Sequence, residues 1–164
     1  MLFPKHLENK ILETLFTYHP YEEISFEIIN MENYNQDIGF GMIGFLEKPL
    51  SENDFIKKIK SKMNISFVKH SRFINKKIHK VAVLGGSGSF AIMPSIKQSA
   101  DALVTSDLKY HDFFKAEKEI LLLDIGHYES EQYTKILIME YLNKKIPNFG
   151  VALAQTTTNP VKYK

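Results

Sequence analysis

The stretch 81–131, VAVLGGSGSFAIMPSIKQSADALVTSDLKYHDFFKAEKEILLLDIGHYESE, decides the fold class of this chain. Three short apolar runs lie in it, and a polar or glycine-containing loop and then a helical pattern follow each run. The pattern predicts strands at 81–84, 102–105 and 120–125, with helices near 90–99, 108–117 and 128–144. Such alternation predicts an α/β fold whose sheet is mostly parallel and covered by helices on both faces.

The flanking sequence extends this pattern in both directions. Ser51 is a good N-cap, with Asp54 as its capping-box-like partner, for a helix over 52–62. The other expected elements are a helix at 5–16, strands at 24–28, 39–46, 65–68 and 151–154, and a polar linker at 30–37. One helix and one strand cannot bury both of their apolar faces. We therefore expect residues 1–36 to be a remnant of another domain, and 37–164 to be the main α/β lobe.

The composition narrows the classes of function. Hydrophobic residues make up 44% and charged residues 24% of the 164 residues, which is typical of a globular protein. A net charge of +2 is too small to predict a nucleic-acid partner. No signal-peptide or membrane-spanning run is visible, so a cytoplasmic location is the default expectation. The absence of cysteine excludes disulfides and thiolate ligands, and leaves His, Asp and Glu to hold zinc, iron or manganese.

His127 and Glu131 form the strongest candidate site. His127 follows a strand and begins a helix, and Glu131 lies four residues later, so the two side chains share one helical face. An imidazole and a carboxylate at this spacing can bind one metal ion or two adjacent ions. The structural alternative is that His127 caps the helix while Glu131 favours its positive N-terminal end.

Asp107, Lys109 and His111 follow the preceding strand and form a second candidate group. They could hold an anionic substrate and transfer a proton. The simpler alternative is that Asp107 is an N-cap and the other two are surface residues. Because loops that follow parallel strands meet at one edge of the sheet, this group is expected near His127.

The glycine-rich loop 85–89 is the third candidate. Its residues Gly86, Ser87 and Gly88 can form a nest of backbone N–H groups that binds an anion. The same residues fit a partial dinucleotide fingerprint, in which Asp107 would bind the ribose. A third interpretation is a tight turn that needs glycine. No Lys-Ser or Lys-Thr follows the loop, so a Walker A motif is excluded.

Taken in order, several segments resemble the Nif-three-like family, whose members are usually called GTP cyclohydrolase 1 type 2 homologs. The segments are HPYEE (19–23), IGFGMIG (38–44), VAVLGGSGS (81–89), DALVTSDLKYHD (101–112), DIGHYESE (124–131) and NPVKYK (159–164). The resemblance implies two α/β lobes that form one metal-binding domain, often with an inserted ferredoxin-like domain. Residues 1–36 resemble the end of that insert, and 37–164 the C-terminal lobe.

The resemblance also implies function. His127 and Glu131 match two ligands of a site for two divalent metal ions, in a homo-oligomer that is a toroidal hexamer. The implied activity is a metal-dependent hydrolase of the GTP cyclohydrolase type, which converts GTP to dihydroneopterin triphosphate and formate. His111 would then be an acid/base candidate. Candidates for binding the nucleotide are Gly86, Ser87, Gly88, Asp107 and Lys109.

One departure limits these expectations. The family's N-terminal lobe supplies a His-His-Pro motif, and no His-His pair occurs in this chain. We therefore expect that the chain is a C-terminal portion of a longer protein, inactive alone and prone to self-association. Two rivals stay open: a non-enzymatic metal-binding hexameric scaffold that docks a regulatory protein partner, and, with less support, an NAD-binding module that uses Gly86, Gly88 and Asp107.

Overall fold

The computed structural model describes residues 1–33 and 38–162, which divide into two compact units, Met1–Gln36 and Asp37–Lys164. The first unit contains the 3-10 helix η1 (Lys5–Leu7) and helix α1 (Glu8–Tyr18), which ends at the expected His19-Pro20 break. The assignment of this unit to an inserted domain stays a prediction. Residues 34–37 of the expected linker lie outside the described residues.

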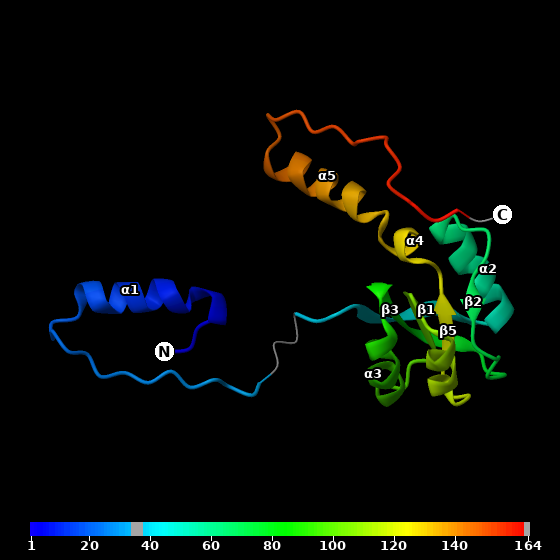
Figure 1. Ribbon diagram of the computed structural model, residues 1–164, viewed down its shortest axis with the longest axis horizontal. Helices are drawn as coiled ribbons and strands as arrows, with labels where there is room; N and C mark the ends of the chain where they lie inside the picture. Colours follow the sequence, from blue (N-terminus) through cyan, green and yellow to red (C-terminus); the bar gives the residue numbers. More distant parts are fainter. Residues whose placement is uncertain (34–37, 163–164) are drawn as a thin grey trace. The chain divides into compact units, whose positions relative to one another are not determined.

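The strand expected at 24–28 is wrong, because this segment is extended but unpaired. A strand requires a hydrogen-bonded neighbour, and the described part of this unit offers only a helix beside it (Figure 1). Phe26 instead contacts Phe16 of α1 edge to face, with ring centroids 5.7 Å apart. Helix α1 has no buried residue.

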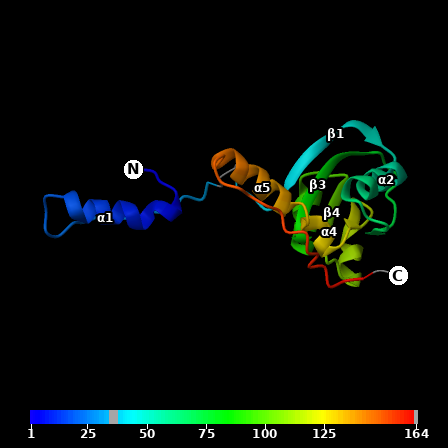
Figure 2. The ribbon, with the colours of Figure 1, turned by 90° about the horizontal axis from the view of Figure 1, so that it is seen from above.

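The second unit is built around a sheet of five strands in the order β1-β3-β4-β5-β2. Their bounds are β1 (Met42–Leu50), β2 (Lys69–His70), β3 (Ile78–Ser87), β4 (Ala102–Ser106) and β5 (Leu121–Asp124). Strands β3, β4 and β5 are parallel, whereas the edge strands β1 and β2 pair antiparallel with β3 and β5. The predicted α/β class is therefore confirmed, with antiparallel edges added. Figure 2 shows β1 along one side of the sheet.

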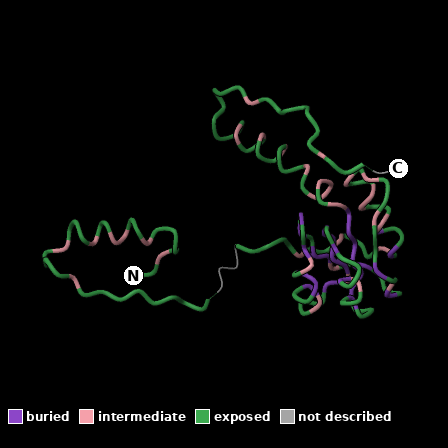
Figure 3. The backbone as a smooth tube through the Cα atoms, viewed as in Figure 1, coloured by how far each residue is buried: buried purple, intermediate pink, exposed green. Residues whose placement is uncertain are grey.

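Both faces of the sheet are covered, as the apolar strands predicted. Every residue of β4 and β5 is buried, and Figure 3 shows the buried residues gathered in this sheet. Helix α2 (Glu52–Met63) covers one face and inserts the fully buried Phe55. The other face is covered by η2 (Ser89–Ala91), α3 (Ile92–Lys97) and the 3-10 helix η3 (Tyr110–Ala116).

The N-cap of α2 is confirmed. Ser51 Oγ accepts a hydrogen bond from the Asp54 amide at 3.2 Å and donates one to Asp54 Oδ2 at 2.7 Å. The strand expected at 65–68 is displaced to Lys69–His70. The reason is that Ile65 and Val68 pack against the α2 side of the core without joining the ladder, while the two following residues pair with β5.

Three further expectations need correction. The helix expected at 108–117 is the 3-10 helix η3. The long helix expected at 128–144 is two helices, α4 (His127–Glu131) and α5 (Thr134–Lys145), separated by a turn at residues 132–133. The strand expected at 151–154 does not form, because no strand in the described part of the chain lies beside it. None of the helices within residues 1–33 and 38–162 has the length and apolar character to cross a membrane.

Candidate functional site

The site lies where the three parallel strands end, and a residue with positive φ lies at or near the end of each strand. These residues are Gly86 in β3 (φ 70°), Asp107 after β4 (φ 57°) and Gly126 after β5 (φ 89°). Glycine adopts this conformation without strain, and aspartate tolerates it better than most residues. These backbone bends bring the end of β3 and the loops after β4 and β5 together at the carboxyl edge of the sheet, as parallel α/β topology leads one to expect.

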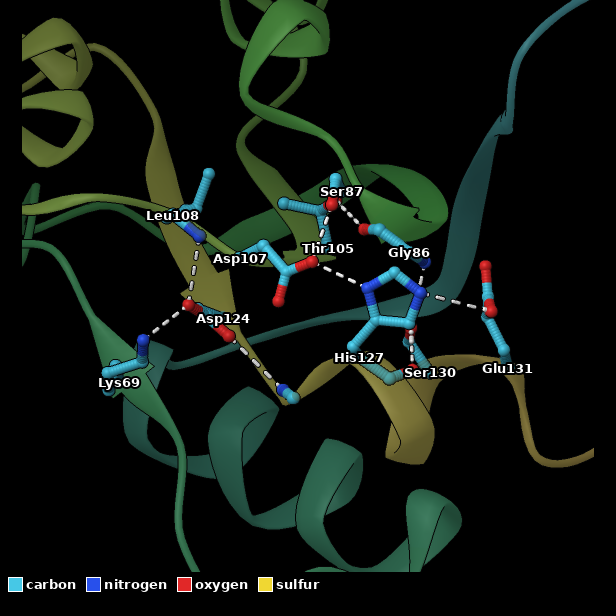
Figure 4. A network of polar contacts seen from close by, with 11 residues as sticks. Lys69, Gly86, Ser87, Thr105, Asp107, Leu108, Asp124, His127, Ser130 and Glu131 are labelled. Carbon is cyan, nitrogen blue, oxygen red and sulfur yellow. Dashed lines mark hydrogen bonds and ion pairs between the residues drawn. The ribbon is translucent and has the colours of Figure 1, made fainter. Parts of the chain in front are cut away.

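His127 and Glu131 point toward one another from α4 (Figure 4). His127 Nε2 lies 3.3 Å from Glu131 Oε2, and each side chain is about half exposed. The other ring nitrogen, Nδ1, lies 2.5 Å from Asp107 Oδ2. A carboxylate on Nδ1 orients the imidazole and favours the tautomer with the free lone pair on Nε2, as in carboxylate–histidine–metal arrangements.

Asp107 connects β3 to His127. The Ser87 hydroxyl donates to Asp107 Oδ2 at 2.5 Å, so this oxygen contacts both the hydroxyl and the imidazole. The hydrogen bond from Ser87 and then that from His127 lower the pKa of Asp107. The hydrogen bond to Asp107 raises the pKa of His127, with Glu131 as a weaker contributor. The sequence placed Asp107 in the pocket, and the structure adds that its carboxylate orients the histidine.

Gly86 allows β3 to approach His127 and Glu131 closely. These two residues are called the donor pair below, because their side chains could donate electron pairs to a metal ion. A Cβ atom at this position would lie 2.5 Å from Glu131 Oε1 and 3.6 Å from His127 Cε1. The Gly86 amide donates to Ser130 Oγ at 2.8 Å, and the Ser130 hydroxyl donates to the His127 carbonyl at 2.8 Å. Ser130 was missed in the sequence, where nothing distinguishes it from other helix-surface serines.

The glycine-rich segment is not an open loop. Its first three residues, 85–87, belong to β3, which corrects the expected loop boundary. The amide of Gly88 donates to the Ser106 carbonyl at 3.3 Å, and that of Gly86 to Ser130. Both amides therefore have partners within the protein, and the carboxylate of Asp107 is engaged as described. These contacts favour a close-packing role for the glycines over an anion nest or a dinucleotide site.

Lys109 and His111 lie apart from the donor pair. The Lys109 amide donates to Asp112 Oδ2 at 3.0 Å at the start of η3. The ring of His111 contacts Tyr110, with centroids 5.2 Å apart. Both residues are exposed, and neither is among the described residues that line the hollow beside the donor pair.

That hollow has a volume of about 1390 Å³ and lies within the second unit. Asp107, His127 and Glu131 line it together with Lys69 and Asp124. Its other walls come from the segment after α2, from α4, from the first two turns of α5 and from the C-terminal segment 154–161. Asn159 Nδ2 fastens that segment by donating to Glu129 Oε1 at 3.1 Å.

Two metal donors are available in this arrangement, namely His127 Nε2 and Glu131 Oε2. In the part of the chain that the structure describes, no group of three or more His, Asp or Glu residues is arranged to hold a metal ion. Catalytic metal sites normally use three protein ligands. The oriented imidazole, the adjacent carboxylate and the room left by Gly86 therefore fit part of a metal site.

Fold and site together define an α/β lobe that carries a His–carboxylate pair at the carboxyl edge of its parallel strands. Residues 5–160 match the family described as Duf34/NIF3 (NGG1p interacting factor 3), and the chain belongs to this family. The resemblance seen in the sequence is thereby confirmed.

Named relatives and solved structures support this membership. Proteins called "GTP cyclohydrolase 1 type 2 homolog" from Staphylococcus aureus (strain MRSA252) and Staphylococcus epidermidis (strain ATCC 12228) are 33% and 34% identical over 150 residues. Each match covers 89% of this chain but only 41% of the relative. A Staphylococcus aureus crystal structure matches the whole chain, and 54% of its own, with a TM-score of 0.77 at 30% identity. A Bacillus cereus protein related to NIF3 matches 99% of this chain and 46% of its own, with a TM-score of 0.71 at 27% identity.

Proposed function

We propose that this chain contributes His127 and Glu131 to a dinuclear metal site, and that the whole protein is a metal-dependent hydrolase that acts on a nucleotide. The single observation that carries the proposal is the 3.3 Å approach of His127 Nε2 to Glu131 Oε2. Asp107 supports it by occupying the opposite ring nitrogen, because a ligand histidine normally has such a partner.

The residues of this chain orient the two proposed ligands, and their chemistry determines which metal ions suit the site. Asp107 and Ser87 hold the imidazole so that Nε2 faces the Glu131 carboxylate, and Gly86 leaves room for that carboxylate. Nitrogen and oxygen donors suit zinc, iron or manganese. When bound, a divalent metal supplies Lewis acidity and makes water a nucleophile near neutral pH. Because two donors are too few, the remaining ligands would come from outside the described residues, from the same protein or from another subunit of a homo-oligomer.

GTP is the proposed substrate because the relatives are called GTP cyclohydrolase 1 type 2 homologs. In this reaction, net uptake of water converts GTP to formate and dihydroneopterin triphosphate. The hollow beside the donor pair is large enough for a nucleotide-sized ligand. Since this chain spans 41% of the length of such a relative, substrate and activity are proposals for the whole protein.

A second candidate function is a metal-binding scaffold that docks a protein partner. The family description, "NGG1p interacting factor 3", names a protein interaction and favours this candidate. Turnover separates the two functions. The metal-loaded whole protein should release formate from GTP, or product from another nucleotide of a panel, if it is an enzyme. Tight metal binding without turnover of any nucleotide would favour the scaffold.

Metal analysis of the purified whole protein, which contains the remaining ligands, tests the site itself. His127→Ala and Glu131→Gln should each weaken zinc binding at least tenfold, because each removes one of few donors. His79→Ala is the matched control, since His79 is exposed at the beginning of β3 with its ring against Phe45. Wild-type zinc affinity in His127→Ala would refute the proposed ligands.

A further inference from the structure

We propose that Asp124 is the positioning residue of this site, because its carboxylate joins the two loops that carry Asp107 and His127. The inference rests on the proposed metal site. Asp124 closes β5 and is 3% exposed, yet no metal-binding or substrate-binding role in this chain involves it. The sequence offered one signal: a carboxylate that ends an otherwise apolar run, LLLD, directly before the turn to His127.

The ladder between β4 and β5 ends before it reaches the site residues. Its last register pair is Thr105 with Asp124, and one further bond runs from the Ile125 amide to the Thr105 carbonyl at 3.0 Å. Beyond this point the two loops leave the sheet through the positive-φ residues Asp107 and Gly126. The sheet's own hydrogen bonds therefore do not fix the distance between Asp107 and His127.

The Asp124 carboxylate continues the connection (Figure 4). Its Oδ2 accepts from the Leu108 amide at 3.1 Å, and its Oδ1 accepts from the Gly126 amide at 3.1 Å. Leu108 directly follows Asp107, and Gly126 directly precedes His127. One side chain thus holds the backbone next to each member of the Asp107–His127 pair, and each of its oxygens serves a different loop.

Lys69 of β2 brings a third segment to this carboxylate. Its ammonium lies 2.6 Å from Asp124 Oδ2, and the Lys69 side chain stays 62% exposed while that of Asp124 is 2% exposed. A buried carboxylate needs such a partner together with its hydrogen bonds. The arrangement suits an ionised aspartate at this position better than an amide. If asparagine replaced Asp124, its amide nitrogen would face a backbone N–H, because only the oxygen of its two terminal atoms can accept a hydrogen bond.

The test compares Asp124→Asn with Glu52→Gln. Glu52 is a matched control because it is also a buried carboxylate that accepts from two backbone amides, those of Ile74 at 2.6 Å and Asn75 at 3.1 Å. It belongs to α2 and is not among the described residues that line the hollow. Both substitutions remove a buried charge, so both should lower the melting temperature.

Two measurements distinguish positioning from general loosening. The first is the pair of ¹⁵N NMR chemical shifts of the His127 imidazole in metal-free protein, which we call the His127 signature. The signals are assigned by their loss in His127→Ala, and they report the hydrogen bond between Nδ1 and Asp107. The second is zinc affinity. We expect Asp124→Asn to shift the His127 signature and to weaken zinc binding by about 10- to 100-fold, whereas Glu52→Gln changes neither.

A wild-type His127 signature and zinc affinity in Asp124→Asn would overturn the proposal, and so would equal effects of Glu52→Gln. If the whole wild-type protein, with all of its ligands present, binds no zinc, the proposed function fails, and the imidazole signature still decides the positioning role. Should Asp124→Asn not fold, amide hydrogen exchange of wild-type protein replaces it. Leu108 and Gly126 amides that exchange as fast as those of an open loop would refute the inference.

Discussion

Gly86→Ala is expected to damage the donor pair through a single methyl group. The new Cβ would lie 2.5 Å from Glu131 Oε1 and 3.4 Å from Glu131 Cδ, so the carboxylate must move. In addition, the backbone of Gly86 has φ 70°, a conformation that alanine adopts only with strain. Strain of this kind costs about 1–3 kcal/mol. Since about 1 kcal/mol corresponds to about 2–4 °C in Tm for a domain of this size, a decrease of several degrees is expected.

Thermal unfolding and zinc titration measure the two consequences separately. Gly86→Ala should lower Tm and also weaken zinc binding, because the displaced Glu131 carboxylate no longer lies 3.3 Å from His127 Nε2. Gly88→Ala should lower Tm by overpacking, at about 1–3 kcal/mol, because its Cβ would overlap Thr105. Its effect on zinc affinity should be smaller than that of Gly86→Ala, because Thr105 is connected to the donor pair only through its hydrogen bond to the Gly86 carbonyl.

Gly44→Ala is the neutral control in β1. A Cβ there would meet no heavy atom within 4 Å, and the backbone has no positive φ. Loss of freedom in the unfolded chain should make this variant equal to wild type or more stable by about 0.4–1 kcal/mol. The reasoning is refuted if Gly86→Ala matches Gly44→Ala in Tm and wild type in zinc affinity.

Two further predictions concern stability alone. Hydrogen bonds from the Lys115 side chain and then from the Lys109 backbone lower the pKa of Asp112. Its ionised form therefore stabilises the fold above about pH 3.9, the usual pKa of an aspartate, and this contribution is lost as the pH falls through the lowered pKa of the folded state. Urea unfolding from pH 5 to pH 2 should therefore show a smaller acid-induced loss in Asp112→Asn than in wild type, and equal losses would contradict this origin. Ser51→Ala should reduce the free energy of unfolding by about 0.5–2 kcal/mol, because it removes the N-cap of α2; an unchanged urea midpoint would show that the cap contributes nothing.

The sequence predicted the parts of the fold that depend on local pattern and burial. The runs around Val104 and Leu122 predicted central strands because strands buried on both faces need continuous apolar side chains. The failures at 24–28 and 151–154 have one cause. Alternation shows that a segment can be a strand, but pairing depends on a neighbour that is distant in sequence, and neither segment has one in the described part of the chain.

The candidate site divides in the same way. The contact between His127 and Glu131 follows from a spacing of four residues on a helix, so the sequence sufficed. The bond from Asp107 to His127 depends on how far each loop extends beyond the sheet, which no local pattern encodes. The sequence therefore placed Asp107 correctly at the edge but suggested substrate binding, and it gave no role to Asp124.

Helix α4 explains why positioning and stability are inseparable at this site. It has only five residues and none of them is buried, so neither propensity nor apolar packing can hold it. Its position depends instead on polar contacts at both of its ends and along its length: His127 with Asp107, Ser130 with Gly86, and Glu129 with Asn159. A substitution that breaks one of these contacts both frees the helix and moves a donor. Zinc affinity alone therefore cannot separate a ligand from a residue that holds the helix, whereas the state of the His127 imidazole in metal-free protein can.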